Sequence, residues 1–156
     1  MVRPMGIRFI LAFLILLPFS ACRLSIGDGE SKVELAEFMG ALQHHSQKLG
    51  LSIQAKNSSL SNFYLHETEE VLEELKEIEE YEGLPIKKPV RVIMDELVQA
   101  LADSLRSENW KRADADYRQL IDGCNRCHAS QEVEFIKILP RTKHNPFAQD
   151  FSKARK

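Results

Sequence analysis

Cysteine is scarce in this chain of 156 residues, and its scarcity limits the chemistry that the chain can perform. The three cysteines are Cys22, Cys124 and Cys127. Cys22 closely follows an apolar N-terminal run, which sets it apart from the rest of the chain. Two thiols therefore remain for the body of the chain. Two thiols are too few for a four-thiolate zinc site or for a framework of several disulfides.

The N-terminal stretch lacks an apolar run long enough to cross a membrane. Its run Phe9–Phe19 has 11 residues, whereas a transmembrane helix needs about 20. Arg3 and Arg8 precede the run, and two small residues lead from it to Cys22. This pattern resembles a bacterial lipoprotein signal peptide over residues 1–21, with lipid attached to Cys22. Plain secretory cleavage and an uncleaved N-terminal anchor are the alternatives.

Lipidation would place the mature chain outside the cytoplasm, on the periplasmic or cell-surface side of a membrane. The lipid at Cys22 would hold it on the membrane surface, and residues 22–30 would form the lipidated N-terminus and a short spacer. Arg23 stands where an aspartate would indicate retention in the inner membrane, so we expect the outer membrane.

An excess of positive charge is absent as well. The formal net charge is −2 at pH 7, and loss of residues 1–21 would lower it to −4, because that stretch holds Arg3 and Arg8 and no acidic residue. A negative balance argues against nucleic acid as a partner.

Period-2 alternation of polar and apolar residues, which is typical of strands, is also absent from the body of the chain. Apolar residues instead recur every three or four positions, which indicates amphipathic helices. We expect four of them, at about residues 31–55, 60–82 and 89–105, and from about residue 107 or 109 to beyond 128. Ser31 and Glu34 form a capping box before the first, Gly83 and Pro85 end the second, and Pro89 suits the first turn of the third.

Four helices with short connections predict an all-α fold, namely an up-down-up-down four-helix bundle over residues 31–134. A basic and irregular tail follows at residues 135–156. Phe147 and Phe151 in this tail indicate that it packs against the helices.

The stretch Cys124-Asn125-Arg126-Cys127-His128 has the C-x-x-C-H spacing of a covalent haem attachment site. Its two thiols can bond to two vinyl groups at one edge of a porphyrin, and His128 then lies under the iron as the proximal ligand. Covalent attachment occurs on the far side of the membrane, in agreement with the predicted export.

Three other interpretations of the motif remain. A redox dithiol is usually found at a helix N-terminus after a strand, whereas this motif ends a predicted helix with no strand before it. A zinc site would need His128 and a further histidine, and adjacent Cys127 and His128 are poorly placed to chelate one ion. A plain disulfide or a chance match is the third alternative.

The position of the motif, late in the last predicted helix, resembles the cytochrome c′ family. The resemblance covers about residues 31–130 and depends on Cys124, Cys127, His128, Met39 and the number of helices. The periplasmic b-type cytochrome of the same architecture is similar too. The resemblance implies one covalent haem c per chain, near the C-terminal end of the fourth helix, and residues after 130 extend beyond the usual end of the family.

The expected function depends on which group occupies the sixth position of the iron, opposite His128. An antiparallel bundle places the start of the first helix beside the end of the fourth, and Met39 lies there on the apolar stripe. Similarity to the b-type relative implies that Met39 is the second iron ligand, while ordinary core packing of Met39 is the alternative. His45 lies about 9 Å further along the helix axis. The remaining candidates are His44, His66 and His144.

One histidine and one methionine raise a haem potential relative to two histidines, which suits a one-electron carrier. We therefore expect a lipid-anchored electron-transfer cytochrome with an unidentified redox partner protein, and a homodimer is an open possibility. An open sixth iron position would instead favour binding of nitric oxide or carbon monoxide. The sequence contains no acid–base pair or nucleophile arrangement, so we do not expect an enzyme.

Gly123, just before Cys124, would permit either close approach of the porphyrin or a local kink.

Overall fold

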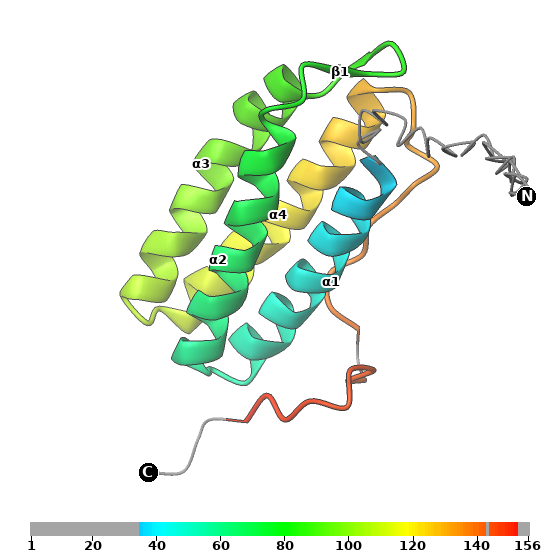
Figure 1. Cartoon of the computed structure of the whole chain (residues 1–156). Coiled ribbons are helices and arrows are strands. Elements are labelled where there is room, and N and C mark those ends of the chain that lie inside the picture. Colours follow the sequence, from blue (N-terminus) through cyan, green and yellow to red (C-terminus); the bar gives the residue numbers. More distant parts are fainter. Residues whose placement is uncertain (1–34, 143, 153–156) are drawn as a thin grey trace, which may run out of the picture. The chain divides into compact units, whose positions relative to one another are not determined.

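The computed structural model describes residues 35–142 and 144–152, which belong to one compact unit spanning Val33–Lys156. The described residues form four α-helices and one small β-hairpin (Figure 1). The helices are α1 (Leu35–Gln54), α2 (Ser58–Leu75), α3 (Lys87–Arg106) and α4 (Trp110–Ser130); the strands are β1 (Glu80–Tyr81) and β2 (Leu84–Pro85). The prediction of an all-α chain with four helices is confirmed. The predicted signal peptide, Cys22 and the capping box at Ser31 lie outside the described residues.

The helices pack in sequence order and enclose one core. Each helix contacts the next one along the chain, and α1 also contacts α4 (Figure 1). The most deeply buried side chains come from all four helices and are mainly leucine, isoleucine and tyrosine: Leu49, Ile53, Leu75, Leu101, Leu105, Tyr117, Leu120 and Ile121. Burial of these apolar side chains is the main force that holds the helices together.

Local signals set where the helices begin. Asn57 caps α2, its side-chain oxygen accepting a hydrogen bond from the amide of Leu60 at 3.2 Å. Asn109 caps α4 in the same way through the amide of Arg112, also at 3.2 Å. Each cap satisfies an amide that has no partner within its helix.

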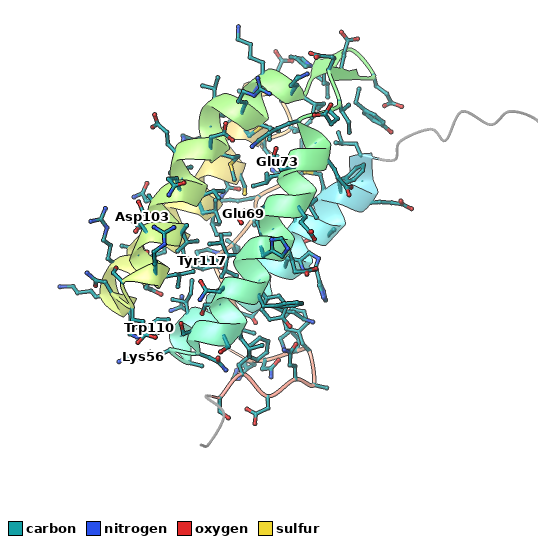
Figure 2. The ribbon with its side chains drawn as sticks, turned by 60° about the vertical axis from the view of Figure 1, so that its left-hand side comes forward. Lys56, Glu69, Glu73, Asp103, Trp110 and Tyr117 are labelled. Carbon is teal, nitrogen blue, oxygen red and sulfur yellow. The ribbon has the colours of Figure 1, made fainter. Side chains whose placement is uncertain are left out.

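Three helices end with the same turn. Lys56, Glu108 and Glu132 each have a positive φ, between 49° and 59°, two residues after α1, α3 and α4 end. The amide of the next residue in each case donates to a carbonyl five positions earlier, at 3.0 Å. This arrangement satisfies carbonyls that the helix leaves free and reverses the chain within a few residues. Figure 2 labels Lys56 at the end of α1.

The second helix is shorter than predicted. We expected a helix to Glu82, but α2 ends at Leu75, and residues 80–85 form an antiparallel hairpin that pairs Glu80 with Pro85 and Tyr81 with Leu84. Glu82 and Gly83 at its tip have φ values of 51° and 87°, as a type I′ turn requires. The apolar repeat therefore overstated the helix, because the turn needs residues just before Gly83 to leave the helical conformation.

The C-terminal segment (residues 131–142 and 144–152) is irregular and runs back along the helices. The side chain of Gln47 donates to the carbonyl of Leu139 at 2.8 Å and accepts from the amide of Thr142 at 3.1 Å. Asn57 donates to the carbonyl of Phe151 at 3.2 Å, and the Phe151 side chain is buried. These contacts agree with the prediction that the tail packs against the helices.

No helix within the described residues is both long and apolar enough to cross a membrane.

Candidate functional site

A cavity of about 490 Å³ lies where α1 begins and α4 ends. This volume is within the roughly 300–1,000 Å³ typical of small-molecule sites. Most of its walls are apolar, and they come from α1, α2, β1, α3, α4 and the C-terminal segment. The lining residues are Leu35, Ala36, Met39, Gly40, Leu42, Gln43, Ser46, Thr68, Tyr81, Met94, Leu120, Cys124, His128, Ile136 and Ile138.

This cavity brings together three of the four residues that the sequence predicts to hold a haem. Met39 comes from the second turn of α1, while Cys124 and His128 come from the last two turns of α4. The spacing of four residues places Cys124 and His128 on one face of α4. Cys127 follows Cys124 by about one turn and is partly exposed, but it is not among the residues that line the cavity.

The two thiols are free and lie in a desolvated environment. Burial, with a smaller contribution from the neighbouring Cys127, raises the pKa of Cys124 to about 11. Burial also raises the pKa of Cys127. A redox-active dithiol needs the opposite shift, because the thiolate is its reactive form. Both pKa shifts therefore argue against the redox-dithiol interpretation of the motif.

The ring of His128 is oriented by the chain that follows it. Its Nδ1 lies 2.7 Å from the carbonyl oxygen of Ile136. A carbonyl can only accept a hydrogen bond, so this contact requires the proton to be on Nδ1. The lone pair of the neutral ring is then on Nε2, which is the tautomer that a metal-binding histidine held by a backbone carbonyl adopts.

Two methionines line the cavity, and Met39 is the one that the sequence predicts as an iron ligand. Met39 is partly buried on α1, and Met94 is almost fully buried on α3. Met94 also packs beside Gly123, where an added Cβ would lie 3.3 Å from its sulfur. Its place on the apolar stripe of the third predicted helix was visible in the sequence, but that pattern does not distinguish a cavity wall from core.

None of the other histidines in the described residues lines this cavity. The ring of His45 lies next to Tyr64, and its Nε2 is 4.0 Å from Glu67. His44 contacts the ring of Phe147 edge-on. His66 is exposed on α2 and His144 is exposed in the C-terminal segment. Among the candidates for a second iron ligand, the cavity therefore includes Met39 alone.

Gly123 serves helix packing. A Cβ atom there would lie 2.5 Å from Cδ1 of Leu97 on α3, so the missing side chain lets α3 and α4 approach closely. Neither porphyrin approach nor a kink is needed to explain this residue.

Several residues of the site were not predicted. Tyr81 was placed on a helix that ends before it, and Ile136 and Ile138 follow the predicted motif in an irregular segment. Thr68 lies on the inner stripe of α2, where its hydroxyl donates to the carbonyl of Tyr64 at 2.7 Å. The periodicity of a helix could have indicated Thr68, but it contains no information about how hairpins and loops fold back.

Within the described residues, no group of three or more His, Cys, Asp or Glu side chains is arranged to hold a metal ion. The pair His128 and Met39 does not form such a group, because one of its two donors is the thioether of a methionine.

No protein-family model, no curated protein and no solved structure matches this chain.

Proposed function

We propose that this chain is a monohaem c-type cytochrome that carries single electrons outside the cytoplasm, held on a membrane by lipid at Cys22. The observation that carries the proposal is the shared cavity. One thiol of a C-x-x-C-H motif, the histidine of that motif and a methionine from another helix line the same apolar space. Few functions other than haem binding need these three groups around one cavity.

In this proposal haem c is bound covalently through Cys124 and Cys127, with His128 as the proximal iron ligand and Met39 as the sixth. The bound haem supplies a one-electron couple, and the chain supplies its binding and surroundings. The hydrogen bond from His128 Nδ1 to the Ile136 carbonyl leaves Nε2 free to coordinate. The apolar lining keeps water away, and a thioether ligand raises the potential relative to a second histidine.

The proposed topology is an up-down-up-down four-helix bundle of the cytochrome c′ kind. Short connections between α1 and α2 and between α3 and α4, together with contacts between α1 and α4, support it. In such a bundle the haem would lie near the C-terminal end of α4.

An acidic surface on α2 would suit a basic redox partner protein. Glu69, Glu70 and Glu73 lie on α2, where Figure 2 labels the first and the last of them. Lys76, which directly follows α2, pairs with Glu73 and Asp95. The same charges would oppose a homodimer through α1 and α2, which the resemblance to cytochrome c′ would otherwise favour. We propose no enzymatic activity and no nucleic-acid partner.

The test is a visible absorption spectrum of the full chain, exported with its own N-terminal stretch in a bacterial host that attaches haem c. We expect haem that stays with the denatured polypeptide, and we expect its loss in the double variant Cys124→Ala/Cys127→Ala. His66→Ala is the matched control, because that exposed histidine lies on α2 away from the cavity and should leave the spectrum unchanged.

Addition of nitric oxide then separates the two functions. A low-spin spectrum that does not change with the gas supports the electron carrier. A high-spin spectrum that shifts on addition would mean that Met39 is only a wall residue and that the chain is a gas-binding protein. A wild-type chain without covalent haem would contradict the proposal as a whole.

A further inference from the structure

The chain turns back on itself directly after the C-x-x-C-H motif. Glu132, with a φ of 59°, lets the amide of Val133 donate to the carbonyl of His128 at 3.0 Å. The amide of Ile136 then donates to the carbonyl of Val133 at 2.9 Å. These two bonds return the Ile136 carbonyl to the ring of His128, so an irregular segment fixes the orientation of that ring.

One side chain of the motif holds this returning segment against α4. The amide group of Asn125 donates to the carbonyl of Ile138 at 2.9 Å, and its oxygen accepts from the amide of the same residue at 2.8 Å. Asn125 thus satisfies both backbone polar groups of Ile138, as a paired strand would. Haem attachment itself places no demand on position 125, which lies between the two cysteines, so this role is additional to the motif.

We propose that Asn125 is a positioning residue for His128. It fixes the segment Ile136–Ile138, whose first carbonyl receives the Nδ1 proton of His128, and thereby keeps Nε2 as the coordinating nitrogen. The consequence for the iron rests on the proposed function, whereas the consequence for the histidine tautomer does not.

Loss of this clamp has a defined chemical effect. A hydrogen bond from Nδ1 to a carbonyl makes the imidazole a more basic ligand. A more basic ligand favours the more positively charged, oxidised iron. When Ile136 is free to move away, the bond weakens and the midpoint potential of the haem rises.

The test compares Asn125→Ala and Asn125→Gln with wild type, in the full chain. The glutamine keeps both polar groups but displaces them by one methylene, so it also tests the geometry should the alanine variant fold poorly. Asn57→Ala is the matched control, because Asn57 holds the same C-terminal segment at Phe151 and Ser152, far along the chain from Ile138.

Three measurements are needed. Hydrogen exchange reports on the Ile138 amide, and we expect it to exchange about tenfold faster in both Asn125 variants. Nitrogen NMR of the haem-free chain reports the tautomer of His128, and we expect a single Nδ1-protonated form in wild type and a mixture in the variants. Redox titration of the haem form should give a higher midpoint potential in the variants and an unchanged one in Asn57→Ala.

Faster exchange at Ile138 with an unchanged tautomer and an unchanged potential would overturn the inference, because the segment would then be loose without affecting His128. If the wild-type chain binds no haem, the proposed function fails, but the tautomer in the haem-free chain still decides this inference. A single Nδ1-protonated form that is lost in the Asn125 variants supports it, and a form retained in them overturns it.

Discussion

Gly50 of α1 lies directly against the ring of Tyr117 of α4, so that a Cβ atom at position 50 would be 2.5 Å from both Cζ and Oη of the tyrosine. Tyr117 is completely buried between the helices, where Figure 2 labels it. Its hydroxyl accepts a hydrogen bond from the amide of Arg141 at 3.0 Å, which ties the C-terminal segment to α4. The closeness of α1 and α4, which both line the cavity, therefore depends on a residue without a side chain.

Gly50→Ala should destabilise the chain by about 1–3 kcal/mol, the usual effect of overpacking a core. Gly40→Ala on the same helix is the control, because nothing lies within 4 Å of a Cβ atom there. It should stabilise the chain by about 0.5–1 kcal/mol, since alanine is the better helix former. Urea unfolding of both variants checks the contrast, and equal effects at the two positions would contradict the packing argument.

The two thiols of the haem-free chain should react at different rates with an alkylating reagent. With a pKa of about 11, Cys124 is about 0.1 % thiolate at pH 8, so its reaction should be slow and should accelerate until the pH approaches 11. Measurement in Cys124→Ala and Cys127→Ala variants isolates each thiol. Rapid alkylation of Cys124 at neutral pH would show that it is not desolvated and would revive the redox-dithiol interpretation.

Met39→Leu and Met94→Leu should have different effects on the haem form, although both methionines line the cavity. Leucine has a similar volume, so each variant should cost less than about 1.5 kcal/mol in stability. We expect the sulfur-to-iron absorption band to disappear in Met39→Leu and to persist in Met94→Leu. Loss of the band in Met94→Leu alone would mean that α3, and not α1, provides the sixth ligand.

Asp114 links the stability of the C-terminal segment to pH. Burial alone would raise its pKa, but hydrogen bonds from Arg118 and Arg141 outweigh this effect and hold the pKa below its ordinary value of 3.8. Because the folded pKa is below the unfolded one, the stabilisation is fully present above about pH 4 and is lost as the pH falls through the folded pKa.

Asp114→Asn should therefore remove up to about 1 kcal/mol at pH 7 and less at pH 3, since its partners are partly exposed to solvent. Asp103→Asn is the matched control, because Asp103 pairs with Arg106 on the exposed surface of α3, whereas Asp114 lies on α4. Unfolding measured at both pH values checks the prediction. The same loss for Asp114→Asn at pH 3 as at pH 7 would be inconsistent with a lowered pKa.

The sequence predicted the helices well where local signals act. Asn57 and Asn109 cap α2 and α4 through their own side chains, and the starts expected from the sequence lie within three residues of the observed ones. The end of α2 could not be located in this way, because the apolar repeat continues to Ile78. Gly83 requires a turn, and the extent of that turn depends on how residues 80–85 pair. Because residue 81 was expected on a helix, Tyr81 was not predicted to line the site.

The site was predictable to the extent that it lies on helices. Cys124 and His128 share a face of α4 by spacing alone, and the antiparallel order of the helices brought Met39 into consideration. Ile136, Ile138 and the role of Asn125 were not predictable, since an irregular segment has no periodicity from which its path can be inferred. Haem attachment, the sixth ligand and the lipid anchor stay predictions.

By itself, the sequence determined an all-α chain with a C-x-x-C-H motif late in its last helix, because helical periodicity and motif spacing are properties of neighbouring residues. Only the tertiary structure decided that Met39, Cys124 and His128 line one cavity and that the Ile136 carbonyl meets His128. Those relationships depend on how closely α1 and α4 approach and on where the chain returns after Glu132, and both result from packing between residues distant in sequence.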